Sequence, residues 1–341
     1  MRLFFQACLL SFCFLSCSKG SDTGSGTTDL GPTNLTITPT VMNDNSGNVN
    51  FVAAAVNAVS YEYDFGNGQY QIVGNGSVSY KYTASGNYTV TVKAKSSTGK
   101  TISATTQVTI VVALSLIWSD EFNTPGVPDQ SKWDYDLGAG GWGNNELQYY
   151  TNRTDNVTVS NGTLKIIAKK ETYQGSSYTS ARLLSKGKFS FQYGKVEVSA
   201  KLPAGAGSWP AIWMLGDNFA TAGWPTCGEI DIMEQKGSDI NKIFGTVHYL
   251  GHSGAGGVGS TTVINNVTTE FHKYGLIWNS ASVQFLVDDV VFYTFTNVSN
   301  LPFNQKFFMI LNLAMGGDFG GKIDPAFTSA MMEVDYVRVY Q

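Results

Sequence analysis

The sequence predicts an all-β protein built from two successive sandwiches. Only nine of its 341 residues are Glu, so the Glu/Lys/Leu/Ala-rich stretches that form helical bundles are missing. Val, Thr, Tyr, Phe and Gly dominate instead, and these residues favour strands and tight turns. Short segments of alternating apolar residues recur along most of the chain. At roughly 150 residues per domain, this length indicates about two domains.

Charge and cysteine content exclude several classes of protein. The chain carries 22 Lys and Arg against 26 Asp and Glu, a net charge of −4, and it has no basic run. Nucleic-acid binding, which depends on phosphate contacts, is therefore not expected. Three of the four cysteines, Cys8, Cys13 and Cys17, fall in the first 17 residues, and Cys227 stands alone. A disulfide-framed secreted domain needs paired cysteines in its folded part, so that class is excluded as well.

The N-terminal segment has the pattern of an export signal. Residues 1–16 combine Arg2 with an apolar run that is too short for a membrane span and suits a signal peptide. The run ends Phe-Leu-Ser-Cys, which resembles the lipobox of bacterial lipoproteins and implies lipidation at Cys17. Residues 17–33 are rich in Gly, Ser, Thr and Asp and are expected to form a flexible linker. We therefore expect an exported protein held by acyl chains on a bacterial membrane, at the outer membrane, the cell surface or the periplasmic face.

Residues 34–113 predict a small β-sandwich, because strands such as 88–92 alternate with turns such as Asn45-Ser46-Gly47-Asn48. The text Tyr63-Asp-Phe-Gly-Asn-Gly68, followed by Gly86-Asn-Tyr-Thr-Val-Thr-Val92, resembles the PKD (polycystic kidney disease) family of immunoglobulin-like domains. A spacer is the expected role of this segment, and glycan binding stays an open alternative.

Residues 114–341 continue the β pattern over a length that is normal for one large sandwich. Lys188–Tyr193 and Val196–Leu202 alternate, so each is expected to be a strand with one buried face. Phe307–Met315 is almost wholly apolar, which suits a central strand covered on both faces. No stretch has convincing helical periodicity. One large antiparallel sandwich is the simplest interpretation.

The segment from Glu229 to Glu234 carries the chemistry. Side chains two positions apart in a strand share a face, so Glu229 and Asp231 point one way while Ile230 and Ile232 enter the core. Glu234 would lie on the core side of a regular strand, where an uncompensated carboxylate costs several kcal/mol. A β-bulge near Met233 returns it to the face of the other acids.

Three acids on one open face suit glycoside hydrolysis by double displacement. One carboxylate attacks the anomeric carbon while a second acid protonates the leaving oxygen. The central Asp231 would bind the nucleophile and raise the pKa of its neighbour by like-charge repulsion.

Glu229-Ile-Asp-Ile-Met-Glu234 resembles the signature of glycoside hydrolase family 16. The flanking segments Gly141–Tyr150, Ser208–Leu215 and Asp335–Val339 are similar to those of its bacterial laminarinases, which are endo-β-1,3-glucanases. The resemblance implies a β-jelly roll with a concave substrate cleft. It also implies that Glu229 is the nucleophile, Asp231 the assisting acid and Glu234 the acid/base of a retaining enzyme.

The same resemblance implies the sugar contacts. Trp209 and Trp213 match positions that hold sugar rings, and Trp142 could rim the same cleft; indole faces suit the apolar faces of sugars. His248 matches a histidine on the leaving-group side. Asn145 and Glu146 are expected to bind sugar hydroxyls, although a purely structural role is nearly as well supported for Glu146.

No cofactor is expected for catalysis. His248 and His252 lack a third ligand or an HExxH motif, so zinc is not expected. Many members of the family hold a structural calcium, and the matching positions are Asp335 with the carbonyls of Glu121 and Gly162.

Laminarin-type β-1,3-glucan is the expected substrate of a monomeric enzyme. Mixed-linkage β-1,3/1,4-glucan, or less readily agarose or carrageenan, is the alternative within the family. A non-catalytic glycan-binding lipoprotein is the alternative from another class, but it does not require the three acids that this sequence keeps.

Overall fold

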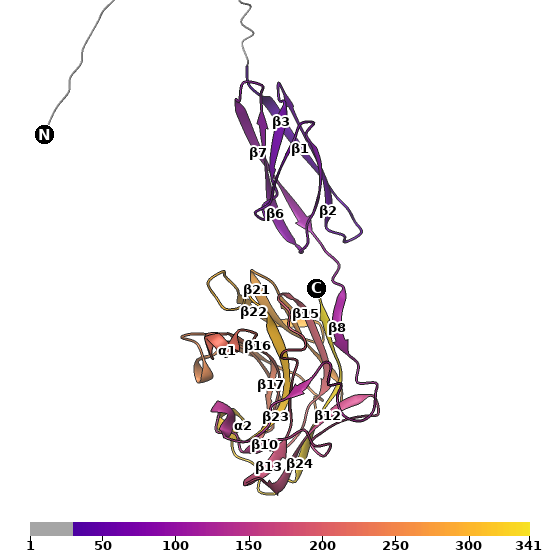
Figure 1. Ribbon diagram of the computed structural model, residues 1–341, viewed down its shortest axis with the longest axis vertical. Helices are drawn as coiled ribbons and strands as arrows, with labels where there is room; N and C mark the ends of the chain where they lie inside the picture. Colours follow the sequence, from indigo (N-terminus) through magenta and orange to yellow (C-terminus); the bar gives the residue numbers. More distant parts are fainter. Residues whose placement is uncertain (1–29) are drawn as a thin grey trace, which may run out of the picture. The chain divides into compact units, whose positions relative to one another are not determined.

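The computed structural model describes residues 30–341, so the predicted signal peptide, Cys17 and most of the predicted linker lie outside the described residues. The chain divides into two compact units, one ending at Ala113 and the other running from Leu114 to Gln341. Both consist of strands and turns, which confirms the all-β prediction (Figure 1). In the described part of the chain, no helix is long and apolar enough to cross a membrane.

The N-terminal unit is a sandwich of two antiparallel sheets. The first has three strands in the order β1 (Thr33–Val41), β2 (Asn48–Val56) and β5 (Ser77–Lys81). The second has four, in the order β4 (Tyr70–Val73), β3 (Ser60–Asp64), β6 (Gly86–Lys95) and β7 (Thr101–Ile110). The alternation in these strands places one face inward. Phe51, Tyr63 and Phe65 are fully or almost fully buried in the resulting core, with ring centroids 5.8–6.0 Å apart.

The second unit is a jelly roll made of two larger sheets, which we call the cleft sheet and the back sheet. The cleft sheet has seven strands in the order β19 (Val258–Val263), β18 (Asp239–His248), β17 (Glu229–Lys236), β16 (Ser208–Gly216), β23 (Phe307–Met315), β14 (Arg182–Leu184) and β9 (Asp134–Tyr135). The back sheet contains β8 (Leu116–Asp120), β10 (Gln148–Tyr150), β11 (Val157–Ser160), β12 (Thr163–Tyr173), β13 (Ser176–Ser180), β15 (Gly194–Lys201), β20 (His272–Trp278), β21 (Ser282–Val287), β22 (Val290–Thr296) and β24 (Ser329–Tyr340).

Helical turns are short and lie in connections. Among residues 30–341, two are α-helical, α1 (Phe219–Ala222) and α2 (Gly317–Gly320), and two are 3₁₀ turns at Gly141–Gly143 and Gly254–Gly256. Each α segment has only four residues and spans about one turn, too short to be stable by itself. Their positions are therefore set by the strands that they connect.

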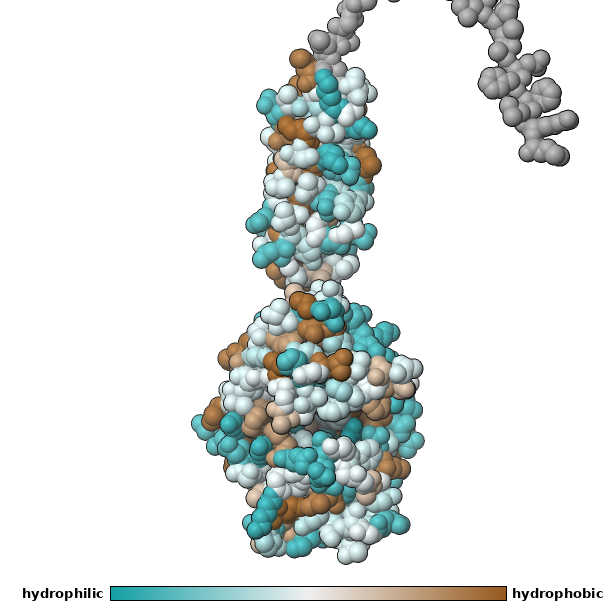
Figure 2. Space-filling model, turned by 90° about the vertical axis from the view of Figure 1, so that its left-hand side faces the viewer, coloured by the Kyte–Doolittle hydropathy of each residue, from teal (hydrophilic) through white to brown (hydrophobic). Residues whose placement is uncertain are grey.

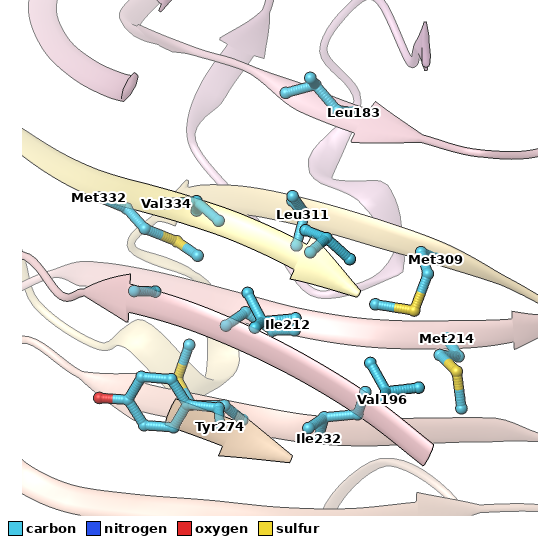
Figure 3. Close-up of a cluster of buried hydrophobic side chains, with 14 of the residues drawn as sticks. Leu183, Val196, Ile212, Met214, Ile232, Tyr274, Met309, Leu311, Met332 and Val334 are labelled. Carbon is cyan, nitrogen blue, oxygen red and sulfur yellow. The ribbon is translucent and has the colours of Figure 1, made fainter. Parts of the chain in front are cut away.

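The main core fills the space between the cleft sheet and the back sheet. Figure 3 shows Ile212, Ile232 and Leu311 from the cleft sheet packed against side chains of the back sheet such as Val196 and Val334. All five are at most 1% exposed. Because one face of the cleft sheet is committed to this core, its opposite face is available for the polar residues of a site.

Strand β23 refines the prediction of a strand covered on both faces. Phe307, Met309 and Leu311 point into the core, whereas Phe308 and Ile310 belong to a smaller cluster that lines a cavity on the other face. All nine residues of β23 are buried. The apolar run therefore reflects a core on one side and a cavity floor on the other.

The predicted strand at Lys188–Tyr193 is wrong. This segment is irregular and carries a single bridge, between Phe191 and Phe307. It connects β14 of the cleft sheet to β15 of the back sheet, so it cannot follow either ladder. Its alternation arises because Phe189 and Phe191 stack on each other, with Phe189 also stacked on Trp118.

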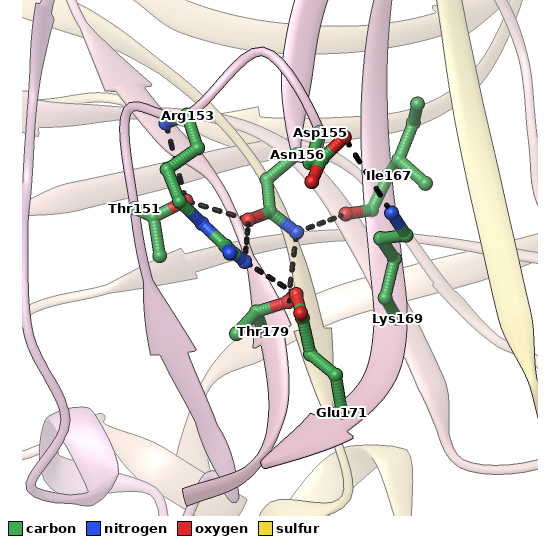
Figure 4. Close-up of polar contacts among 8 residues, drawn as sticks. All are labelled: Thr151, Arg153, Asp155, Asn156, Ile167, Lys169, Glu171 and Thr179. Atoms are coloured by element: carbon green, nitrogen blue, oxygen red, sulfur yellow. Dashed lines mark hydrogen bonds and ion pairs between the residues drawn. The ribbon is translucent and has the colours of Figure 1, made fainter. Parts of the chain in front are cut away.

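A buried polar network fastens the loop after β10 to the back sheet (Figure 4). Asn156, fully buried, accepts a hydrogen bond from Thr151 and donates to the Ile167 carbonyl. Arg153 and Thr179 both donate to Glu171. Because every buried polar group needs a partner, this network fixes the loop in one arrangement.

Candidate active site

Strand β17 carries the three predicted acids, and a β-bulge brings them to one face. Opposite β18, Asp231 pairs with Thr246 and Glu234 with Phe244, so three steps on β17 match two on β18. Pairing with β16 shows a register shift at the same place. This irregularity confirms the predicted bulge and turns Glu234 to the side of Asp231.

The opposite face of β17 supplies the anchor. Ile230, Ile232 and Met233 are fully buried and belong to the main core. Their burial fixes the register of β17, because a slip by one residue would exchange the acids with the core residues. The core therefore holds the acids in place.

Each predicted catalytic glutamate accepts a hydrogen bond from an indole N–H. Trp224 Nε1 donates to Glu229 Oε2 at 3.0 Å, and Trp209 Nε1 donates to Glu234 Oε1 at 2.9 Å. These bonds restrict the rotamers of the two carboxyl groups. Trp224 lies just after α1 and is 46% exposed, and sequence reasoning did not assign it to the site.

Asp231, between the two glutamates in the chain, faces His248. The distance from His248 Nε2 is 3.1 Å to Asp231 Oδ2 and 3.8 Å to Glu229 Oε1. Gly257 lies so close to the imidazole that a Cβ atom there would be 2.4 Å from His248 Cε1. The loop after β18 therefore needs glycine to cover the ring. The sequence predicted a sugar contact for His248; the structure gives it a carboxylate neighbour, and the sugar contact stays a prediction.

Burial raises the pKa of Glu229, Asp231 and Glu234, each to about 8. The charge of Asp231 raises the pKa of both glutamates further. Three coupled carboxyls cannot all ionise at neutral pH, so the cluster keeps protons. His248 lowers the pKa of Glu229, but burial and the charge of Asp231 have the larger, opposite effects.

The acids line a cavity of about 400 Å³ on the outer face of the cleft sheet. Figure 2 shows this side of the unit, where the surface is hollowed. The lining includes four of the predicted sugar contacts, Trp142, Glu146, Trp209 and Trp213. A mostly apolar pocket with a few convergent polar groups is the usual form of a ligand site.

Sequence reasoning missed Arg182, which lies between two of the tryptophans. Its guanidinium carbon is 5.1 Å from the centroid of the Trp142 ring and 4.7 Å from that of Trp213. The ion pair between Arg182 Nε and Asp136 Oδ2, 2.9 Å apart, orients it from the other side. Arg182 and Asp136 both line the cavity: the pairing of β14 with β23 brings Arg182 there, and the pairing of β9 with β14 brings Asp136 beside it.

Glu146 is held by protein partners. One of its oxygens accepts from Asn144, and the other accepts from Gln148 and Tyr150. Tyr150 in turn accepts from Asn312. These contacts favour the structural role that the sequence left open for Glu146.

Asn145 and Trp142 lie in the same glycine-rich loop but differ in position. Asn145 is exposed and outside the cavity lining, and its amide donates to Asp318 Oδ1 at 2.9 Å. Trp142 lines the cavity, and its indole donates to the Gly138 carbonyl. A sugar contact by Asn145 stays a prediction.

The predicted calcium ligands adjoin one interval of β24 and do not line the cavity. Along β24, the pairing with β12 ends at Val334, opposite Leu164, and the pairing with β8 begins at Val337, opposite Asp120, the last residue of β8. Asp335 lies in the interval between the two pairings. Gly162 precedes β12 and Glu121 follows β8, so both adjoin the same interval.

The donor chemistry of this interval suits calcium. Asp335 is partly buried, and among the described residues no lysine or arginine forms an ion pair with it. The Glu121 side chain is bound by Arg338, at 2.9 and 2.7 Å, which leaves its backbone carbonyl as the predicted ligand. A carboxylate with backbone carbonyls is an oxygen donor set of the kind calcium prefers.

Cys227 lies beneath the cleft rather than in it. It is fully buried in the small cluster with Leu215 and Phe308, and no disulfide involves it. Burial raises the pKa of its thiol to about 11, so it is not a reactive thiolate at neutral pH.

Comparisons with known proteins agree with this geometry. Residues 144–338 match the family model of glycosyl hydrolases family 16, and residues 34–112 match the PKD domain. The chain is 45% identical over 242 residues to a β-glucanase of Rhodothermus marinus, covering 66% of this chain and 85% of the relative. It is 37% identical to the glucan endo-1,3-β-glucosidase A1 of Niallia circulans, covering 68% of this chain but only 38% of that longer protein.

A solved structure shows the same fold. A protein from Z. galactanivorans, crystallised with laminaritriose and laminaritetraose, is 45% identical to this chain and superimposes with a TM-score of 0.63. The match covers 67% of this chain and 100% of that one.

Proposed function

Because the chain belongs to glycosyl hydrolase family 16, we propose that it is a retaining endo-β-glucanase that cleaves laminarin-type β-1,3-glucan. The observation that carries the proposal is the bulged strand β17, which presents Glu229, Asp231 and Glu234 on one face of a tryptophan-lined cavity. The relatives named above are glucanases, which supports the choice of glucan over other polysaccharides.

In the first step, the Glu229 carboxylate attacks the anomeric carbon and the glycosidic C–O bond breaks. Glu234 gives its proton to the departing oxygen, which leaves as a hydroxyl. The raised pKa of Glu234 keeps that proton available at neutral pH. Asp231 positions the nucleophile, and whenever Asp231 is ionised its charge raises the pKa of Glu234, which favours the protonated acid.

In the second step, water replaces the leaving group. Glu234, now a carboxylate, accepts a proton from that water while the water oxygen attacks the anomeric carbon. The bond between the anomeric carbon and Glu229 breaks, and Glu229 leaves as a carboxylate. No step needs a cofactor, because the two carboxyl groups supply both the nucleophile and the proton.

Activity on defined glucans tests this function. We expect Glu229→Ala and Glu234→Gln to reduce laminarin hydrolysis by at least a factor of about 10³ while the melting curve of the second unit is kept. Leu250→Ser, a change at a 71% exposed side chain, is the control and should leave the rate unchanged. Undiminished hydrolysis in both glutamate variants would exclude the proposed roles.

Product analysis decides between the linkage alternatives. Hydrolysis of laminarin with little release from lichenan supports the β-1,3 preference. Equal rates on both indicate a mixed-linkage enzyme, and cleavage of agarose or carrageenan alone would contradict the glucan proposal. Binding of laminarin without turnover would identify the non-catalytic glycan-binding alternative.

The finer features of the sequence are part of the proposal. We propose that Asp335 and the carbonyls of Glu121 and Gly162 hold a structural calcium ion, and that the enzyme is a monomer. We also propose that the protein is exported and that lipidation of Cys17 anchors it to a bacterial membrane.

Detergent partitioning of the wild-type protein and of Cys17→Ala tests this anchor. If Cys17 is lipidated, only the wild-type protein should enter the detergent phase. Light scattering tests the monomer.

A further inference from the structure

The turn-proximal end of the β17–β18 hairpin carries a cluster that the proposed reaction does not use. We call it the lysine rim and define it as Lys236, Lys242, Phe244 and Phe319. Lys236 is two residues beyond Glu234 on the same face of β17, and Lys242 is two residues before Phe244 on β18. Phe244 pairs with Glu234, so the rim begins directly beside the predicted acid.

The rim is continuous with the cavity through aromatic contacts. The Trp209 ring lines the cavity and is 5.2 Å from the Phe319 ring, which is 5.0 Å from Phe244. Both phenylalanines are only partly buried. A sugar chain on Trp209 would therefore have an aromatic surface beside it, on the side of Glu234.

Both lysines lie over these rings. Lys236 Nζ is 4.4 Å from the centroid of Phe319 and 5.7 Å from that of Phe244, and Lys242 Nζ is 5.3 Å from that of Phe244. Cation–π attraction keeps the ammonium groups at the rim. Lysine donates three hydrogen bonds, and a ring face satisfies none of them fully, so each ammonium keeps donors for another group.

In the described part of the chain, neither lysine of the rim is held in an ion pair, although Lys236 acts on Glu234 at longer range and lowers its pKa slightly. The acids on the same elements are Glu229, Asp231, Glu234, Asp239 and Asp318, and among residues 30–341 none of them forms an ion pair with Lys236 or Lys242. Asp318 instead accepts from Asn145, and Glu234 accepts from Trp209. Because the acid cluster keeps protons at neutral pH, its negative charge is reduced where a bound anion would feel it.

We propose that the lysine rim binds anionic substituents, sulfate or carboxylate, on the β-glucan chain in the cleft. This inference rests on the proposed glucanase function and extends it to a substrate class. Two ammonium groups over an aromatic floor match a sugar that carries one negative group: the sugar face packs on the rings and the anion meets the donors.

Binding is measured with the lysines changed and hydrolysis removed. In a Glu229→Ala background, affinity electrophoresis compares neutral laminarin, sulfated laminarin and carboxymethylated curdlan. We expect Lys236→Met/Lys242→Met to weaken binding of both anionic glucans about tenfold at low salt, on the basis of roughly threefold for each exposed charge pair. Neutral laminarin should change less than twofold, and 0.5 M NaCl should remove most of the difference.

Two matched variants sharpen the result. Lys188→Met removes an exposed lysine that lies outside the cavity lining and the rim, and it should change nothing. Lys236→Arg/Lys242→Arg keeps both charges and should retain binding of the anionic glucans.

The outcomes separate the two proposals. Equal loss for neutral and anionic glucans, or no loss for either anionic glucan, would overturn the rim proposal. Loss for the sulfated glucan alone, or for the carboxymethylated one alone, supports the rim and identifies the preferred anion. Failure of the otherwise wild-type protein to hydrolyse neutral laminarin refutes the glucanase function instead.

Discussion

The two units are both β-sandwiches, but they treat polar groups differently. In the N-terminal unit, Ser96 is the only buried polar residue among the described ones, whereas the second unit buries Asp231, Glu234, His248 and many others. Burying a carboxyl costs free energy unless it is paired or protonated. The N-terminal unit therefore has the composition expected of a structural module, and the second unit carries polar burial that stability alone does not require.

The first prediction removes a core side chain from the unit without buried acids. Phe51 is fully buried against Tyr63 and Phe65, so Phe51→Ala should destabilise the N-terminal unit by about 3–5 kcal/mol. Calorimetry should show its transition at lower temperature, while laminarin hydrolysis at temperatures below that transition stays unchanged. A parallel fall in the hydrolysis rate would show that the N-terminal unit takes part in catalysis, which would contradict its purely structural role.

The second prediction removes a buried acid from the other unit. Asp231→Asn should reduce laminarin turnover by about 10²–10³-fold and at the same time stabilise the unit at alkaline pH. Burial raises the pKa of Asp231 to about 8, from about 4 in the unfolded chain. Between these values the folded state binds the additional proton, so the stability of the wild type falls as pH rises.

Because the stability of the wild type falls as pH rises, the melting temperatures of the two proteins should be compared at acidic and at alkaline pH. The melting temperature of Asp231→Asn should match the wild type near pH 4 and exceed it by about 3–8 °C above pH 8. Glu62→Gln, at an exposed ion pair with Lys93 in the N-terminal unit, is the control and should show no such pH dependence. A variant that melts below the wild type at pH 9 would contradict the cost assigned to the buried acid.

The third prediction concerns calcium, whose proposed ligands all belong to the second unit. At a hundredfold excess over its dissociation constant, a bound ion stabilises by about 2.7 kcal/mol. Chelation of calcium should therefore lower the melting temperature of the second unit and leave that of the N-terminal unit unchanged. Asp335→Asn should abolish the response to calcium. A response in the N-terminal unit, or one that persists in the variant, would exclude the proposed ligands.

The smallest effect is expected from the indole bond to the acid. Trp209→Phe keeps an aromatic face but removes the N–H donor to Glu234, a donor that lowers the pKa of that carboxyl. The alkaline limb of the pH–rate profile should move to higher pH, with a loss of roughly fivefold at neutral pH. Trp118→Phe, in the back sheet, is the matched control. An alkaline limb that stays in place or moves to lower pH would show that this hydrogen bond does not lower the pKa of Glu234.

The sequence predicted the fold class and the acids because both depend on short-range periodicity. Alternation in β15 and the isoleucines between the acids indicate strand faces locally, and a buried Glu234 is costly enough to require the bulge. The strand prediction for Lys188–Tyr193 was wrong for a related reason. Alternation indicates which side chains are buried, and an aromatic stack in a connection between two sheets gives the same pattern as a strand.

Arg182 and Trp224 could not be found in this way. Arg182 reaches the cavity through pairing between β14 and β23, which are more than 120 residues apart, and Trp224 reaches Glu229 from an exposed connection. The lysine rim likewise depends on α2, which is too short to predict from periodicity, lying against β16. Such contacts depend on register between distant strands, and side-chain identity alone does not specify that register.

The sequence by itself determined the strand composition, the two-unit organisation, the family resemblance and the three acids, because alternation, motif spacing and burial cost are properties of neighbouring residues. The tertiary structure alone decided which partners each acid has, that Glu146 is saturated by protein contacts, and that Arg182 lies between two tryptophans. The physical reason is that a hydrogen bond or a ring contact needs two groups within a few ångströms, and only the closed sandwich brings distant strands that near.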